Sequence, residues 1–200
     1  TLADLKAADE LGYRIKLLGV AQRTPHGVEQ RVHPTMVRKT TSIAQVMGVT
    51  NAVTIDADAV HELTLVGPGA GGNATASAVV ADIADIARGV RSRPLGLPRA
   101  ALSKVRRVEM QRHEGGYYIR LAVFDKPGAF AGIATRMADR GISLESIVQR
   151  GRGGDKTGGP VPVVLITYAT TEKLVREALD AIVADGYVAE RPQSIRIERE

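Results

Sequence analysis

The stretch Val66–Ile83, VGPGAGGNATASAVVADI, decides the fold because it joins a strand to a helix through a glycine-rich turn. Before the turn, His61–Val66 predicts a short strand. After the turn, Val79, Ile83 and Ile86 recur at spacings of three and four residues, as on one face of a helix. The stretch therefore predicts a strand end, a turn and a helix start.

Glycine dominates this turn, at positions 67, 69, 71 and 72. Because glycine lacks a Cβ and tolerates positive φ, another backbone or a flat ligand can approach closely. Free N–H groups and the dipole at the helix start favour an anionic or polar ligand. A close helix–strand contact without any ligand explains the same glycines. The turn by itself therefore leaves both interpretations open.

Gly67, Gly69 and Gly72 also match the Gly-x-Gly-x-x-Gly pattern of dinucleotide-binding folds. The context differs, because the chain becomes basic and loop-like after Gly89. No βαβ unit follows, and Arg88–Arg93 occupies the region where an acidic ribose partner is required. The stretch is therefore not the primary nucleotide fold.

The composition is ordinary for a globular chain of one or two domains, with 200 residues, 44% apolar and 24% charged. No run approaches the roughly 18 apolar residues of a membrane span, and no leader is evident, so we expect a cytoplasmic protein without a membrane partner. The absence of cysteine excludes disulfides, thiolate metal sites and cysteine nucleophiles. Thr1–Asp4 spells a helix capping box, which predicts that the chain is cut from a longer one.

The net charge of +5 is concentrated in residues 88–112, where eight Lys or Arg residues accompany the single acidic residue Glu109. We favour a linker with surface arginines over a nucleic-acid partner, because no aromatic residue is interleaved for base stacking. Pro94, Gly96 and Pro98 interrupt regular structure. They place a linker at 91–116, between domains at 1–90 and 117–198.

The first domain is predicted to be a partial mixed sheet with helices. The periodicities and turn signals predict a helix at 1–11, a hairpin of 13–23 with 28–37, a helix at 42–47 capped by Thr41 or Ser42, strands at 51–55 and 61–66, and a helix at 73–88. Strands that end in a glycine turn and a helix need something for that helix to cover. We therefore expect the helix at 73–88 to have an uncovered apolar side.

The second domain alternates strands and helices in the order βαββαβ. The predicted elements are strands at 117–125, 142–150, 161–168 and 194–198, helices after the turn at 125–128 and after Thr170 or Thr171, and a mobile loop at 151–159. This order is typical of two helices over one face of a four-stranded antiparallel sheet, the ferredoxin-like fold. The fold class of the chain is therefore α+β.

Four landmarks in sequence resemble homoserine dehydrogenase. They are Leu11–Gly19, Glu29–Thr35, Gly48–Val53, and Gly67–Gly72 followed by Thr75–Ile83, and together they cover residues 1–90. The resemblance implies the later half of a substrate-binding and dimerisation domain, whose last helix returns to a nucleotide-binding domain. It further implies reduction of L-aspartate 4-semialdehyde to L-homoserine with NADPH or NADH. The nucleotide fold and the catalytic lysine and acidic residues would lie upstream of Thr1, and Gly69, Ala70 and Gly71 would contact the cofactor.

Residues 117–198, with the turn Asp125-Lys126-Pro127-Gly128, resemble an ACT domain. The resemblance implies feedback by an amino acid, most plausibly threonine. Asp125, Gly128 and Ala129 would bind the effector, and Ile147 and Gln149 would face the partner subunit of a homo-oligomer, either a dimer or a tetramer. An ACT-like fold that only dimerises is the alternative.

Other candidate residues do not predict catalysis or metal binding. The histidines at 26, 33, 61 and 113 are scattered, and none has a second ligand four residues away on a helix. Ser77 lacks the turn and the histidine that a nucleophile requires, and the acidic residues at 56, 58 and 62 are explained by a solvated turn. We therefore expect the chain alone to be inactive. A stand-alone amino-acid sensor without catalysis is the alternative function.

Overall fold

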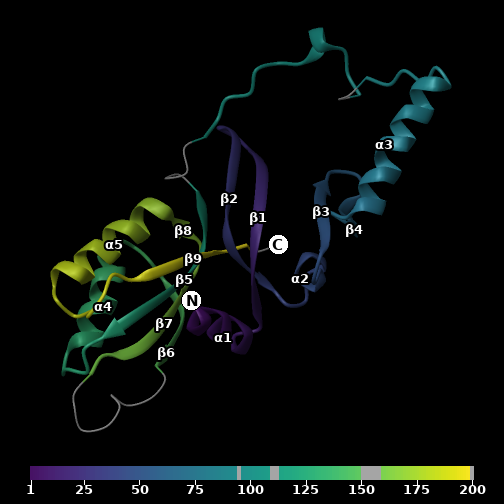
Figure 1. The fold of residues 1–200 in the computed structure, drawn as a ribbon. Coiled ribbons are helices and arrows are strands. Elements are labelled where there is room, and N and C mark those ends of the chain that lie inside the picture. The colour runs from purple at the N-terminus through teal and green to yellow at the C-terminus, as the bar shows by residue number, and fades with distance from the viewer. Residues whose placement is uncertain (94–95, 109–112, 150–158, 199–200) are drawn as a thin grey trace. The chain divides into compact units, whose positions relative to one another are not determined.

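The computed structural model describes residues 1–93, 96–108, 113–149 and 159–198. Contacts between residues divide the chain into two units, Thr1–Arg38 with Arg106–Glu200, and Lys39–Val105 (Figure 1). The predicted α+β class is confirmed, and each unit contains both helices and strands.

The C-terminal part of the first unit has the predicted βαββαβ order. Its elements are β5 (Glu114–Val123), α4 (Ala129–Ala138), β6 (Leu144–Gln149), β7 (Val161–Thr167), the short β8 (Thr170–Thr171), α5 (Glu172–Ala184) and β9 (Gln193–Ile197). The strand order β9-β5-β7-β6 is antiparallel throughout, as the ferredoxin-like fold requires. The loop predicted at 151–159 lies outside the described residues except for Gly159.

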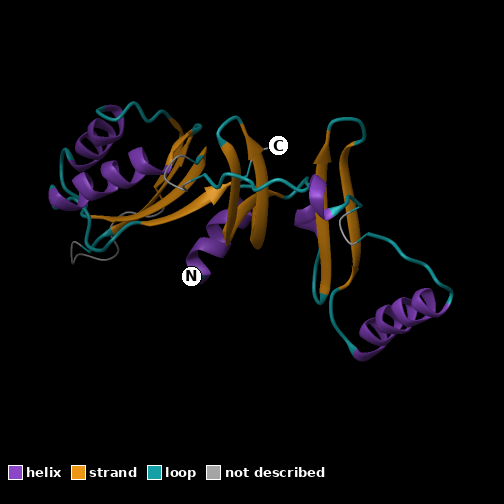
Figure 2. Cartoon of the chain, turned by 90° about the horizontal axis from the view of Figure 1, so that it is seen from above, coloured by secondary structure: helices purple, strands orange, loops and turns teal. Residues whose placement is uncertain are grey.

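Helices α4 and α5 cover one face of this sheet (Figure 2). Alternate residues of β5 point into the layer between helices and sheet, and Ile119, Leu121 and Val123 are fully buried there. Ile133 of α4 and Ile182 of α5 pack against them. Period-two burial on a strand and an apolar ridge on each helix thus build one core. Thr171 caps α5 by accepting a hydrogen bond from the amide of Leu174, which settles the choice between Thr170 and Thr171.

The opposite face of the sheet is covered by α1 (Leu2–Glu10). Ala8 packs there in a second core with Tyr118 and Ile166. The predicted capping box is present, since the Thr1 hydroxyl and the Asp4 amide and carboxylate bond reciprocally. This layer was not predicted, because the sequence analysis assigned α1 to the first domain alone.

The predicted hairpin forms between β1 (Tyr13–Thr24) and β2 (Gly27–Arg38). It extends the sheet rather than standing apart from it, because β2 pairs in parallel with β9 at Thr35↔Arg196 and Met36↔Ile197. The sheet therefore runs β1-β2-β9-β5-β7-β6 and is mixed. Residues from both predicted domains thus share one sheet.

The second unit contains α2 (Ser42–Gln45), β3 (Thr50–Ala57), β4 (His61–Pro68), α3 (Gly72–Ala87) and the short 3-10 helix η1 (Arg99–Ala101). Thr41 caps α2, which ends two residues before the predicted Met47. In the described part of the chain, β3 and β4 pair only with each other. None of the described helices is long and apolar enough to cross a membrane.

Candidate functional site

The glycine turn between β4 and α3 has the geometry of a close-approach site. A Cβ added to Gly69 would overlap the side chain of Asn51 on β3, so only glycine fits at this position. Gly71 adopts φ 117° and begins α3 without any side-chain cap. The first turn of α3 is therefore free to donate its amide hydrogens to a ligand.

The structure leaves this turn open. Gly69, Ala70 and Gly71 are all exposed, and a Cβ at Gly71 or Gly72 would meet no atom within 4 Å. Because glycine has no side chain, there is room beside this helix start for a flat, polar group such as a nicotinamide carboxamide. The residues predicted to contact the cofactor therefore fit such a group.

Helix α3 has no buried residue. The four large apolar side chains Val79, Val80, Ile83 and Ile86 are 52%, 63%, 60% and 75% exposed. Soluble proteins bury a continuous apolar helix face against a partner surface. The uncovered apolar side expected from the sequence is thus present beside the glycine turn.

The predicted effector turn starts α4. Gly128 has φ 87° and no side-chain cap, and Asp125 is exposed just before it. The amide of Ala129 donates a 3.1 Å hydrogen bond to the carbonyl of Lys126, so this N–H is already paired. A carboxylate at this helix start would bind the amides that follow Ala129.

The other two predicted effector residues lie on β6, at the end of the sheet. Gln149 pairs with Val163, which in turn pairs with Leu121 on β5, two residues before that strand ends. Cross-strand neighbours point to the same face, and Leu121 points into the core beneath α4 and α5. Ile147 and Gln149 therefore lie on the face that carries these two helices. Both remain exposed, Ile147 by 51%. The end strand is therefore available to a second copy of the domain.

A buried charge cluster that the sequence did not predict is centred on β2. Arg31 bonds the carboxylates of Glu29 and Glu198, and Nδ1 of His113 lies 2.8 Å from Glu29 Oε1. Burial, and after it the positive charge of Arg31, lowers the pKa of His113. The imidazole is therefore neutral near pH 7, and its Nδ1–H donates to Glu29.

A second buried cluster joins α1 to the central strand of the sheet. The Asp4 carboxylate, on a residue that is 1% exposed, accepts hydrogen bonds from Tyr118 Oη at 3.1 Å and Arg120 Nε at 2.7 Å. Burial alone would raise the pKa of Asp4, but the bonds from Arg120 and Thr1 outweigh it and hold that pKa below its usual range. Asp4 is therefore a charged link between two elements that the sequence placed in different domains.

The described residues contain no group of three or more His, Cys, Asp or Glu residues that could hold a metal ion. His33 is partly buried, with Nδ1 3.0 Å from the carbonyl oxygen of Pro34. His26 and His61 are exposed in or beside turns.

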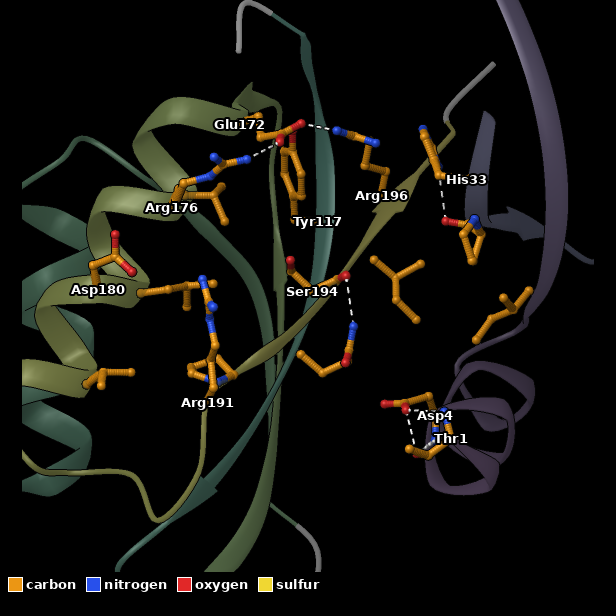
Figure 3. Close-up of a pocket in the computed structure, with 18 of the residues that line it drawn as sticks. Thr1, Asp4, His33, Tyr117, Glu172, Arg176, Asp180, Arg191, Ser194 and Arg196 are labelled. Atoms are coloured by element: carbon orange, nitrogen blue, oxygen red, sulfur yellow. Dashed lines mark hydrogen bonds and ion pairs between the residues drawn. The ribbon is translucent and has the colours of Figure 1, made fainter. Parts of the chain in front are cut away.

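A pocket of about 850 Å³ opens between β9 and β2 (Figure 3). Helix α5 contributes side chains on one side of β9, and β2 and α1 contribute them on the other (Figure 3). The carboxylate of Glu172 accepts bonds from Arg196 and, at 2.8 Å, from Arg176. Sequence patterns gave no sign of this pocket, because its walls come from segments far apart in the chain.

Comparison with known proteins identifies two family segments in this chain. Residues 1–84 match the model of the homoserine dehydrogenase family, and residues 117–184 match the ACT domain model. A homoserine dehydrogenase of Pseudomonas aeruginosa is 41% identical over 205 residues, which covers 100% of this chain and 47% of that protein. One from Neisseria gonorrhoeae is 41% identical over 201 residues, covering 98% of this chain and 46% of that protein.

The same family appears among solved structures. A homoserine dehydrogenase from Thiobacillus denitrificans matches with a TM-score of 0.87 at 39% identity, covering 99% of this chain and 45% of that chain. A Staphylococcus aureus enzyme at 22% identity and a TM-score of 0.64 shares the fold. The chain thus spans just under half the length of the curated relatives that it matches.

Proposed function

We propose that this chain, which belongs to the homoserine dehydrogenase family and ends in an ACT domain, is the C-terminal portion of a reductase that converts L-aspartate 4-semialdehyde to L-homoserine. The reaction uses NADPH or NADH and belongs to the whole protein. This chain supplies part of the substrate domain, the cofactor-contacting turn and the regulatory domain.

One observation carries this proposal: an open glycine turn leads directly into a helix whose apolar side is uncovered. The relatives are about twice as long as this chain, and the partner for that side would be the nucleotide-binding region that the resemblance implies in their remaining length. Packing Val79, Ile83 and Ile86 against that region would bring the turn to the bound nicotinamide. A stand-alone sensor gives no reason for this exposed helix.

The residues of the turn would hold and orient the cofactor rather than react. Gly69 permits contact with the Asn51 side chain, and Ala70 and Gly71 lead into the uncapped amides of α3. Those amides would donate hydrogen bonds to the carboxamide oxygen of the nicotinamide. When bound, the cofactor supplies the hydride that reduces the aldehyde.

Complementation of bacteria tests this function. The chain is expressed in a strain that lacks homoserine dehydrogenase, alone and fused behind the remaining portion of the Pseudomonas aeruginosa relative. We expect only the fusion to restore growth without added homoserine. Growth supported by the chain alone would contradict the proposal, and so would failure of a stably produced fusion.

The regulatory part of the proposal concerns the ACT domain. We expect an amino acid, with threonine as the first candidate, to bind where the start of α4 meets Ile147 and Gln149 of β6, across a dimer or tetramer. The exposure of these two side chains on the helix-bearing face supports this placement. Replacement of Gln149 by Ala should weaken threonine inhibition of the fusion and leave its uninhibited rate unchanged.

A further inference from the structure

The pocket between β9 and β2 exists because their parallel pairing is short. It covers only Thr35↔Arg196 and Met36↔Ile197. The preceding residue on β2 is Pro34, which has no N–H and cannot continue the ladder. The strands therefore separate, and the pocket of about 850 Å³ lies between them. Its volume lies within the usual range of small-molecule sites.

Three buried polar atoms in the walls of this pocket lack hydrogen-bond partners among the described residues. They are Tyr117 Oη, Arg196 Nε and His33 Nε2. Tyr117 is only 2% exposed. Buried polar groups in native proteins are nearly always bonded, so three unpartnered atoms around one pocket are unusual. Other nitrogens of Arg196 and His33 are bonded to Glu172 and to the Pro34 carbonyl, which holds both side chains at the pocket while Nε and Nε2 remain available to a ligand.

The chemistry of the three atoms is complementary. Arg196 Nε and Tyr117 Oη can donate to a negatively charged acceptor. His33 has the opposite role. The Pro34 carbonyl, 3.0 Å from Nδ1, can only accept, and the Thr35 hydroxyl beside Nδ1 donates to the His33 carbonyl, so Nδ1 carries the hydrogen and Nε2 is left as an acceptor. Burial lowers the pKa of His33 and so keeps the imidazole in this neutral form. A ligand must therefore present both an acceptor and a donor.

The remaining charges in the pocket are also of both signs. Arg191 and Asp180 are exposed at its side (Figure 3), and within the described ranges neither forms an ion pair. Glu172 contributes a further carboxylate, and Val175, Leu179 and Ile195 contribute apolar surface. A purely anionic or purely cationic ligand would meet like charge, whereas a small zwitterion would not.

We propose that this pocket binds an α-amino acid, with its carboxylate on Arg196 and Tyr117 and its ammonium group directed to His33 and Glu172. The site is separate from the effector turn at Asp125–Ala129. Its walls come from both family segments, since Leu5, Ile15 and His33 belong to the dehydrogenase match and α5 belongs to the ACT match. A bound amino acid would therefore tie the hairpin and α1 to the regulatory domain.

Calorimetry on the 200-residue chain tests this site. The probes are L-threonine and L-homoserine, with butyrate and 2-aminoethanol as analogues that lack the amino group or the carboxylate. We expect an amino acid to bind and both analogues to bind at least roughly tenfold more weakly, because each loses one set of charged hydrogen bonds.

Two variants locate the binding. Tyr117→Phe removes one hydroxyl that has no partner in the unliganded chain, so it should leave the melting temperature unchanged or higher and weaken binding about fivefold. A purely structural hydroxyl would instead lower the melting temperature and leave the affinity unchanged. Arg196→Gln should weaken binding about tenfold or more, and Gln149→Ala, at the effector site, is the control that should not affect this binding.

The outcomes separate this site from the proposed function. If none of the probes binds, or if Tyr117→Phe and Arg196→Gln both bind with unchanged affinity, the pocket is not an amino-acid site. Weaker binding in Gln149→Ala alone would place the ligand at the ACT effector site, which overturns the pocket proposal and supports the regulatory one. Growth complementation by the fusion does not depend on any of these results.

Discussion

The Arg120 Nε–H donates a 2.7 Å hydrogen bond to the carboxylate of Asp4, across 116 residues of sequence. Asp4 lies on α1 and Arg120 on the central strand β5, so this bond fastens the start of the dehydrogenase segment to the ACT sheet. With the β2–β9 pairing, it joins residues 1–38 of the dehydrogenase segment and the ACT domain in one structural unit.

Replacing Asp4 by Asn tests this link. The variant removes the buried charged partner of Arg120 and leaves only Glu190, whose side chain is 61% exposed, so we expect a loss of about 1–3 kcal/mol in the free energy of unfolding. This value is below that of a fully buried pair, because the Arg120 side chain is 18% exposed. The matched control is Asp139→Asn, which removes a pair with Arg136 between side chains that are 40% and 48% exposed. We expect the control to lose far less stability in urea unfolding, because solvent screens an exposed pair.

The pH dependence of stability should report the buried His113. Its pKa is lowered in the folded chain, mainly by burial, from an unfolded value of about 6.5. Below that value the unfolded chain binds more protons than the folded one, so the free energy of unfolding falls as the pH falls. One histidine gives a slope of at most about 1.4 kcal/mol per pH unit.

Urea unfolding between pH 7.5 and pH 5, roughly spanning that unfolded value, measures this slope. In His113→Gln we expect a shallower slope, whatever the change in absolute stability. His26→Gln, in an exposed turn, serves as the control for removing a histidine. An unchanged slope in His113→Gln would mean that His113 is not held neutral by the fold.

The close contact between Gly69 and the Asn51 side chain can be tested by substitution. Gly69→Ala places a Cβ on the Asn51 side chain and should displace the turn. We expect this to lower the rate of aldehyde reduction by the fusion with the rest of the relative by roughly tenfold or more. Gly67→Ala is the control, because its Cβ meets no atom within 4 Å and its φ is not positive. The double variant Gly69→Ala with Asn51→Ala removes the two closest overlaps and leaves only the Asn51 Cβ at 2.8 Å, so it should recover part of the rate. Equal rates in Gly69→Ala and the unmodified enzyme would remove this turn from the cofactor site.

The exposed apolar side of α3 should be needed for activity of the fusion but not for stability of this chain alone. In this chain Ile83 is 60% exposed, so Ile83→Asp should change the unfolding free energy by less than about 0.5 kcal/mol. In the fusion with the rest of the relative, the same change places a charge in a packed interface and should abolish most of the activity. Asp82→Asn, on the neighbouring helix position, is the polar control. A fully active Ile83→Asp fusion would mean that this side of α3 packs against nothing.

Local patterns in the sequence predicted most elements of the fold. The apolar–polar alternation in β5 and the apolar ridges of α5 predicted the ACT fold, and Gly128 predicted the start of α4. The pairing of β2 with β9 was missed, because two residue pairs separated by about 160 positions leave no periodic signal.

The buried charges were missed for a different reason. Alternating polar residues such as Glu29 and Arg31 look like the solvent face of a strand, and only the tertiary structure shows that this face is buried. Asp4 was recognised as a capping residue, but its bonds to Tyr118 and Arg120 come from a segment more than 100 residues away. The pocket at Tyr117 and Arg196 likewise has no local signature.

The most direct test of the account is the oxidation of NADPH by purified protein in the presence of L-aspartate 4-semialdehyde. The chain alone should show no oxidation above the background, and the fusion with the rest of the Pseudomonas aeruginosa relative should oxidise NADPH only when the aldehyde is present. Oxidation by the chain alone, or a folded and cofactor-binding fusion that leaves the aldehyde unreduced, would contradict the assignment of this chain to a homoserine-forming reductase.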